Sequence, residues 1–320
     1  MVSRRRVLQA SVLAAIAQWF PPALAAPARV GVLSPRLATT LMPMLRKAFA
    51  ELGYREPHTV IFDFRSADDD LARLPRLARS LTEAGCDLLI ALGSEATAKA
   101  LREAATRAPV LFVAVGYDPV ERGVVQSLGR PGGNLTGVYF PTPTLSAKRL
   151  EIAVEVLPDA KRFLAIGDAY TKDQLEAVRR AAEAKQVELI VFEYSRTPYD
   201  LAQAFEAGKR QGAEALIALS SGPLVQRQAD LSRQIVANRL PAFVPAVGVD
   251  SSASLIRYSF DVAKIIHRAA QMGVMLLGGR DPADMPVEGP HEFLLTVNMQ
   301  RAKQLGITIP VSVLARANSV

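Results

Sequence analysis

The residues best suited to chemistry in this sequence lie directly after short apolar runs, where the strands of a parallel sheet would end. Ser94 precedes a helical stretch that starts at Glu95, so its hydroxyl is predicted to cap that helix. The free amides of Glu95 and Ala96 would then point outward and could receive a ligand carboxylate. An ordinary helix cap without a ligand is the alternative interpretation. Residues 94–96 are therefore a candidate anion-binding loop.

Other candidates in the first half of the chain occupy similar positions. Ser34 follows the apolar run 29–33, and Tyr117 follows another such run. The rings of Tyr117 and Tyr139 could stack on a planar ligand, or they could pack at a hinge. Asp118 opens an Asp-Pro-Val turn, which favours a structural role even though it lies near a strand end.

The second half of the chain repeats this arrangement. Asp168 could accept a ligand ammonium group, or it could cap the helix that follows. Ser220 and Ser221 precede a helix that begins with proline, so capping accounts for only one of the two hydroxyls. Val247 follows a further apolar run and completes the candidate positions at the strand ends of this half.

Catalytic motifs are not found in the sequence. The three histidines, His58, His267 and His291, have no spacing typical of a metal site. The serines at 220–221 lack the first glycine of a nucleophile elbow, and no glycine-rich phosphate or dinucleotide loop occurs. We therefore expect ligand binding without a cofactor, a metal or catalysis.

The elements that would position these residues alternate between apolar runs and helical stretches. Strands are expected at 29–33, 59–64, 87–92 and 109–115, with helices at 41–52, 71–84 and 95–105. The pattern restarts with strands at 162–166, 187–192, 215–219 and 242–244, separated by helices at 171–185, 199–211 and 224–238. This alternation predicts an α/β fold of two Rossmann-like, doubly wound lobes.

Proline and glycine density indicates where the chain would pass between the lobes. Residues 130–137 are predicted to form a turn at the first crossing. The first lobe is expected to comprise residues 26–137 plus 259–292, and the second lobe residues 138–258. Residues 293–320 are expected to form a C-terminal crossing and tail.

The first 25 residues are predicted to be a signal peptide cleaved near Ala25, because a basic head precedes an apolar stretch and an Ala-Leu-Ala site. Residues 3–9 resemble a twin-arginine export signal, and an ordinary secretory signal is the alternative. The segment contains three arginines and no other charged residue, so its removal changes the formal charge from +7 to +4 (7 − 3). The mature protein is therefore expected in the periplasm, with no nucleic-acid partner. Cys86 is the only cysteine, so an intramolecular disulfide is excluded.

Three stretches resemble the ABC transporter substrate-binding proteins, a family that includes tryptophan- and tyrosine-binding members. They are Asp118-Pro119-Val120 with 123–125 and 130–137, then Leu145–Glu151, then 282–288 with its continuation to Ala317. The resemblance implies a periplasmic binding protein type I-like fold with several crossings in its hinge. It also implies a ligand held between the lobes and an ABC permease in the inner membrane as partner. We expect the protein to be a monomer.

Arg257 departs from the family pattern, because it stands where relatives usually have a small residue in a Gly-Gly-Leu-Met-Ser-Tyr-Gly run. If its guanidinium faces the cleft, it could pair with a ligand carboxylate and select an acidic ligand. A surface position or an interlobe salt bridge is the alternative.

We therefore predict a periplasmic solute-binding protein of an ABC importer, which captures an amino acid or related carboxylate between two lobes by hinge closure. A ligand-sensing protein that partners a membrane sensor kinase is the alternative, and a periplasmic hydrolase is a third possibility.

Overall fold

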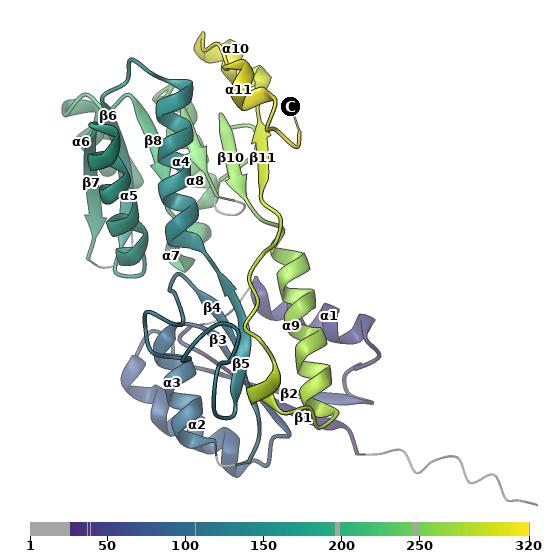
Figure 1. Cartoon of the computed structure of the whole chain (residues 1–320). Helices are drawn as coiled ribbons and strands as arrows, with labels where there is room; N and C mark the ends of the chain where they lie inside the picture. Colours follow the sequence, from purple (N-terminus) through teal and green to yellow (C-terminus); the bar gives the residue numbers. More distant parts are fainter. Residues whose placement is uncertain are drawn as a thin grey trace, which may run out of the picture.

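The computed structural model describes residues 26–319, with gaps at 37, 39, 106, 196–198 and 246–248. Two separate sheets, each with helices on both faces, divide these residues into two lobes (Figure 1). The predicted α/β fold of two doubly wound lobes is confirmed. Within the described ranges, no helix has the length and apolar character that crossing a bilayer requires.

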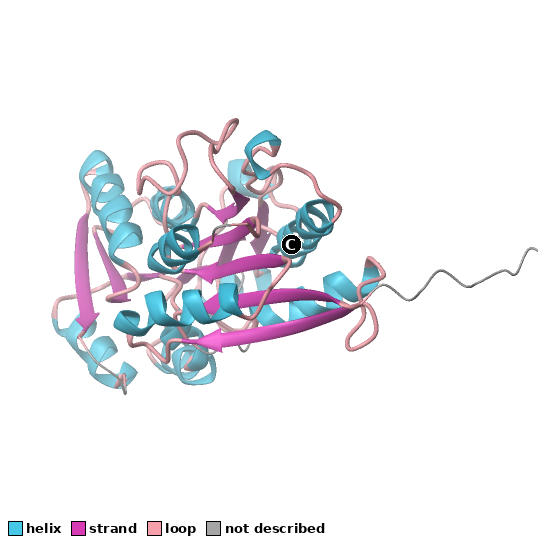
Figure 2. Cartoon of the chain, turned by 90° about the horizontal axis from the view of Figure 1, so that it is seen from below, coloured by secondary structure: helices cyan, strands magenta, loops and turns pink. Residues whose placement is uncertain are grey.

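The sheet of the first lobe has the strand order β2-β1-β3-β4-β5, and all its pairings are parallel. Its strands are β1 (Ala28–Ser34), β2 (Val60–Ser66), β3 (Leu88–Gly93), β4 (Val110–Val115) and β5 (Leu135–Phe140). Helices α1 (Leu41–Glu51) and α9 (Val262–Leu277) cover one face. The other face is covered by α2 (Leu74–Glu83), which follows the short 3₁₀ turn η1 (Leu71–Arg73), and by α3 (Glu95–Ala104). Helices on both sides of these strands are also visible from below (Figure 2).

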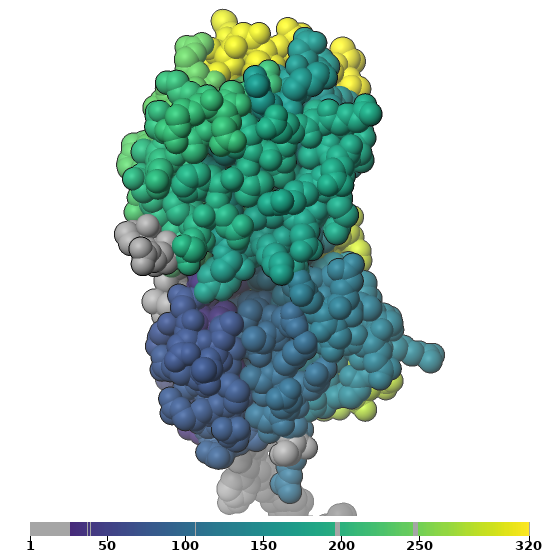
Figure 3. All heavy atoms as spheres, turned by 90° about the vertical axis from the view of Figure 1, so that its left-hand side faces the viewer, coloured from purple at the N-terminus to yellow at the C-terminus, as the bar shows by residue number. Residues whose placement is uncertain are grey.

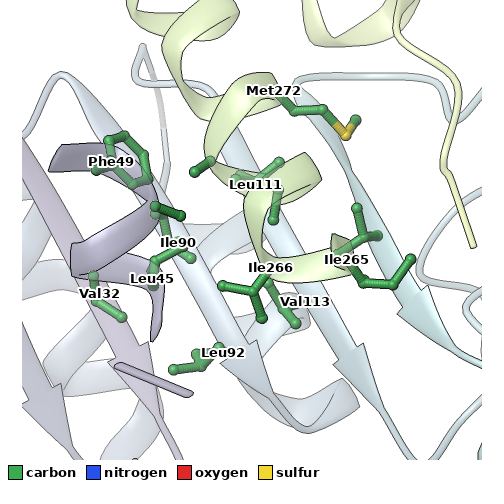
Figure 4. Close-up of a cluster of buried hydrophobic side chains, with 14 of the residues drawn as sticks. Val32, Leu45, Phe49, Ile90, Leu92, Leu111, Val113, Ile265, Ile266 and Met272 are labelled. Carbon is green, nitrogen blue, oxygen red and sulfur yellow. The ribbon is translucent and has the colours of Figure 1, made fainter. Parts of the chain in front are cut away.

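Burial on both faces explains why the inner strands β3 and β4 are apolar throughout. In β3, for example, Ile90 is fully buried and packs in the cluster that α1 and α9 form over the sheet (Figure 4). Phe49 from α1 and Ile266 from α9 belong to the same cluster. Fully burying each such side chain contributes roughly 1.5–3 kcal/mol. A helix from late in the chain therefore completes the core of the first lobe.

The sheet of the second lobe has the order β11-β10-β9-β8-β6-β7, and only β11 is antiparallel to its neighbour. Its strands are β6 (Arg162–Asp168), β7 (Glu188–Tyr194), β8 (Ala215–Ala218), β9 (Ala242–Val244), β10 (Ile256–Ser259) and β11 (Leu294–Val297). One face carries α4 (Thr142–Val156), α5 (Lys172–Lys185), α10 (Met299–Leu305) and α11 (Val311–Leu314). The other carries α6 (Leu201–Arg210), α7 (Gly222–Gln226) and α8 (Gln228–Ala237).

Within the described residues, the chain passes between the sheets three times: from β5 to α4, from β10 to α9, and from the segment after the 3₁₀ turn η2 (Pro282–Asp284) to β11. The space-filling view shows the two lobes as distinct masses that meet along a groove (Figure 3). Such narrow connections allow one lobe to rotate relative to the other.

Two lobe boundaries differ from those expected. Residues 130–137 are not the first crossing, because β5 starts at Leu135 and continues the first sheet to Phe140 beside β4. Nor are residues 293–320 a separate tail, since β11 pairs with β10 and α10 and α11 pack on the second lobe. Local proline and glycine content marked a turn, but it could not show that an apolar strand follows within three residues.

Candidate ligand-binding cleft

A cleft of ≈ 480 Å³ lies between the lobes and is lined by residues of both. Most of the loops that line it follow the carboxyl ends of parallel strands, where doubly wound sheets bind ligands. Its volume is within the range of about 300–1,000 Å³ typical of small-molecule sites.

The wall from the first lobe contains four of the predicted site residues, Ser34, Ser94, Glu95 and Tyr117. Ser94 adopts an extended conformation, and its Oγ accepts a hydrogen bond from the Thr97 amide at 3.4 Å, so the predicted helix cap is present. Glu95 forms an ion pair with Lys99 one turn along α3. Burial raises the pKa of Tyr117 above its usual range, so the phenol remains neutral.

Three predicted residues of this lobe do not line the cleft. Ala96 packs against the core between α2, α3 and the sheet. The Oδ1 atom of Asp118 accepts hydrogen bonds from the amides of Val120 at 2.8 Å and Glu121 at 3.1 Å, so this carboxylate holds a turn. Tyr139 points away from the cleft because side chains alternate along a strand, and its neighbour Phe140 lines the cleft instead.

In the second lobe, Ser220 and Ser221 line the cleft, whereas Asp168 does not. Asp168 is buried, and its Oδ2 accepts hydrogen bonds from the hydroxyls of Ser221 and, at 3.0 Å, Tyr199. Its Oδ1 accepts a hydrogen bond from the amide of Tyr170 at 2.9 Å. This carboxylate therefore orders the loops of the second lobe and is unavailable to a ligand ammonium group.

The remaining two predicted residues lie elsewhere. Val247 falls outside the described residues. Arg257 is half-buried in β10 and does not line the cleft, and its Nη2 donates to the carbonyl of Val249 at 3.0 Å. In this structure, Arg257 therefore does not face the cleft, where the predicted contact with a ligand carboxylate would form.

Sequence reasoning missed Arg149, a buried arginine of α4 that lines the cleft and is only 1% exposed. Its Nη2 donates to Ser146 Oγ at 2.7 Å, and its Nη1 donates to the Tyr258 carbonyl at 3.2 Å. A signal was present, because residues 145, 149, 152 and 156 form the buried stripe of α4 and an arginine interrupts its apolar pattern.

Contacts between the lobes close one side of the cleft. Arg36 of the first lobe lies over the ring of Tyr170 of the second and forms a 2.7 Å ion pair with Asp69. The Tyr170 hydroxyl donates to the same carboxylate at 2.8 Å. Arg122 and Asp173 form a second ion pair between the lobes.

No group of three or more His, Cys, Asp and Glu side chains in the described part of the chain could hold a metal ion. The cleft instead combines hydroxyls and one buried guanidinium with apolar walls. This arrangement suits a small molecule that has a charged or polar end and an apolar body.

The comparisons with known proteins agree with this geometry. Residues 39–320 match the sequence profile of the family described as ABC transporter substrate binding protein. A tyrosine-binding protein from Clostridioides difficile is 27% identical over 265 residues, which cover 81% of this chain and 74% of the relative.

Solved structures share the fold. The ABC domain from Streptococcus pneumonia in complex with L-Trp has a TM-score of 0.74 at 24% identity, covering 92% of this chain and 99% of that one. A ligand-free, open substrate binding protein from Clostridium difficile has a TM-score of 0.64 at 21% identity, with coverage of 92% and 99%. The type I-like fold predicted from the sequence is thereby confirmed. The chain belongs to the family of ABC transporter substrate-binding proteins.

Proposed function

We propose that this protein is the periplasmic binding component of an ABC importer and captures an amino acid or related carboxylate. The observation that carries the proposal is the ≈ 480 Å³ cleft, which both lobes line. Membership of the family supports this function, as does a relative that binds tyrosine.

Capture proceeds by closure of the two lobes. A ligand that touches both walls binds the closed state more tightly than the open state, and it shifts the population toward closure by that difference in affinity. The closed form then presents both lobes to an ABC permease in the inner membrane, and no chemical step is required.

A thermal-shift screen with amino acids, aromatic acids, nucleosides and sugars tests this function, because a ligand that binds the folded state raises its melting temperature. Hits should also reduce the radius of gyration in solution scattering. A protein that no compound stabilises, or whose scattering profile is unchanged at saturating ligand, contradicts the proposal. Uptake of a radiolabelled hit by cells that carry or lack the gene then separates transport from sensing.

Export supports the same function and is proposed from residues 1–25, which lie outside the described part of the chain. N-terminal sequencing of the periplasmic fraction should give a mature protein beginning near Ala26. Replacing Arg4 and Arg5 by lysine should block export by the twin-arginine route, whereas normal export of that variant indicates the general secretory route.

A further inference from the structure

We propose that Arg149 is the carboxylate-recognition residue of the cleft and that the ligand is an organic carboxylate with an apolar body. The inference deepens the proposed function and rests on it. Arg149 is not among the residues that the sequence pattern indicated.

Arg149 lies where two crossings between the lobes come together. It belongs to α4, the first element after the β5 crossing, and its Nη1 is bonded to the carbonyl of Tyr258, just before the β10 crossing. Phe140, the last residue of β5, and Phe260, which directly follows β10, also line the cleft, with ring centroids 5.0 Å apart. The guanidinium is thus at the hinge end of the cleft, which these two aromatic side chains also line.

The charge of Arg149 is not compensated by any described part of the protein. The described residues provide no carboxylate within ion-pair distance, and Nε is a buried donor without a hydrogen-bond partner. A guanidinium has five N–H donors, and the two bonds to Ser146 and Tyr258 leave three of them unused. Burial of an unpaired charge is costly unless a partner arrives.

The protonation state suits an anionic ligand. Burial lowers the pKa of Arg149 to about 9, so the group remains a cation at neutral pH. Its attraction for a carboxylate is strong, because the local dielectric constant around a buried group is low.

The other charged groups that line the cleft are paired, except for Lys172, whose side chain is exposed to solvent. Arg36 pairs with Asp69, and Arg122 pairs with Asp173 and, more weakly, with Glu95. Both acidic lining residues therefore have cationic partners, and Arg149 is left as the buried positive charge of the cleft. A ligand carboxylate is the complementary group.

Hydrogen bonds fix the orientation of the guanidinium. The hydroxyl of Ser146 accepts a hydrogen bond from Arg149 Nη2 and donates one to Gln174 Oε1 at 3.1 Å. Ser146 and Gln174 are both fully buried. Gln174 in turn accepts from the amide of Ser220 at 3.0 Å and donates to its carbonyl at 2.7 Å. The network connects Arg149 to the loop after β8 and holds it in place before a ligand arrives, which lowers the entropy cost of binding.

The rest of the cleft indicates the body of the ligand. One part of its wall is apolar and is formed by Leu41, Met44, Phe140, Leu145, Phe260 and Val262. An aliphatic or aromatic carboxylate fits this wall, whereas a sugar would leave its hydroxyls without partners there.

Arg301 in α10 provides a matched control. It is 5% exposed, its Nε also lacks a partner, and burial also lowers its pKa, but it does not line the cleft. A purely structural role for a buried arginine would apply to both residues, whereas ligand recognition applies to Arg149 alone.

The test measures affinities by calorimetry for L-tryptophan, L-tyrosine and 3-phenylpropionate, each alongside its primary amide. Any other carboxylate found in the thermal-shift screen is carried through the same comparison. We expect each acid that binds to bind about 30-fold or more tightly than its amide, since the amide leaves the buried guanidinium unpaired. An amide that binds as tightly as its acid overturns the inference without any variant.

Three variants complete the test. Arg149→Met should lose about 30-fold or more in acid affinity, retain amide affinity within about 3-fold, and melt at the same or a higher temperature than the wild type without ligand, because an uncompensated buried charge is removed. Arg149→Lys, which keeps the charge but loses the planar fork, should be intermediate. Arg301→Met should leave affinity within about 3-fold.

The outcomes separate the two proposals. If no compound of the screen stabilises or closes the protein, the binding function itself fails. If only neutral compounds bind, or if Arg149→Met retains the acid affinity of the wild type, the binding function stands and carboxylate recognition by Arg149 is overturned. If Arg149→Met does not fold, the comparison of acids with amides on the wild type decides.

Discussion

The guanidinium of Arg36 in the first lobe lies 4.0 Å from the ring centroid of Tyr170 in the second lobe. Asp69 joins the two residues, because its Oδ1 accepts from Arg36 Nη2 at 2.7 Å and from the Tyr170 hydroxyl at 2.8 Å. These contacts exist only while the lobes are close together. The three side chains therefore form a latch that holds the two lobes in the arrangement of this structure.

Removing the Tyr170 ring should shift the protein toward an open state. A cation–π contact contributes roughly 0.5–1 kcal/mol at such a site, and a hydrogen bond to a carboxylate about 1.5–3 kcal/mol. We expect Tyr170→Ala to bind ligand about 10-fold more weakly and to increase the radius of gyration of the ligand-free protein. Tyr170→Phe keeps the ring and should show a smaller loss. An Ala variant with the affinity and scattering profile of the wild type would mean that the latch does not contribute to closure.

Gly222 gives an independent way to disturb the same latch. An ideal Cβ at this position would lie 2.7 Å from Arg36 Nη1, so Gly222→Ala should displace the guanidinium from Tyr170. Because Arg36 is flexible at its far end, the free energy of unfolding should change by no more than about 0.5 kcal/mol. Ligand affinity should fall. In an Arg36→Ala background the same substitution should have no further effect on affinity, and a full additional loss would contradict the steric explanation.

Most of the fold could be predicted from the sequence, because continuous apolar runs such as 88–92 have few alternatives to a doubly covered parallel strand. The carboxyl ends of these runs correctly indicated Ser34, Ser94 and Ser220 as lining residues. For each of these serines, its position relative to the end of a strand was sufficient for the prediction.

Residues whose role depends on distant partners could not be assigned in this way. Asp168 is unavailable to a ligand because Tyr199 and Ser221 donate to it from 31 and 53 residues away. Arg149 was missed for the opposite reason, since an arginine on the buried stripe of a helix conflicts with local patterning. Such conflicts between local pattern and fold are expected at functional sites.

The backbone of β4 comes so close to Gly137 in β5 that this position requires a glycine. An ideal Cβ there would lie 2.1 Å from the carbonyl oxygen of Phe112 in β4, and backbone cannot move aside cheaply. We expect Gly137→Ala to lower the free energy of unfolding by about 3 kcal/mol or more, with a matching fall in melting temperature. Gly129→Ala is the control, because nothing lies within 4 Å of its Cβ position. Equal melting temperatures for the two variants would show that β5 adapts to the extra methyl group.

An ion pair ties the connector that leads to β11 to helix α9 of the first lobe. Glu288 receives two hydrogen bonds of 2.7 Å from Arg268 in α9, and this bidentate contact lowers the pKa of the Glu288 carboxyl. A carboxyl group whose pKa is lower in the folded state stabilises the protein above the pKa of its unfolded state, near 4.5, and loses that contribution as the pH falls through its folded value. Glu288→Gln should therefore be less stable than the wild type at pH 7, by about 1 kcal/mol at most because the pair is partly exposed.

The difference between Glu288→Gln and the wild type should shrink as the pH falls below 4.5, which melting curves at pH 7, 5 and 3 can measure. Glu292→Gln is the control from the same connector, because the Glu292–Lys264 pair is largely exposed and is screened by solvent and salt. The control should melt close to the wild type at every pH. If Glu288→Gln is less stable than the wild type by the same amount at pH 3 as at pH 7, the Glu288 side chain acts through packing. Its charge then does not hold the third crossing to the first lobe.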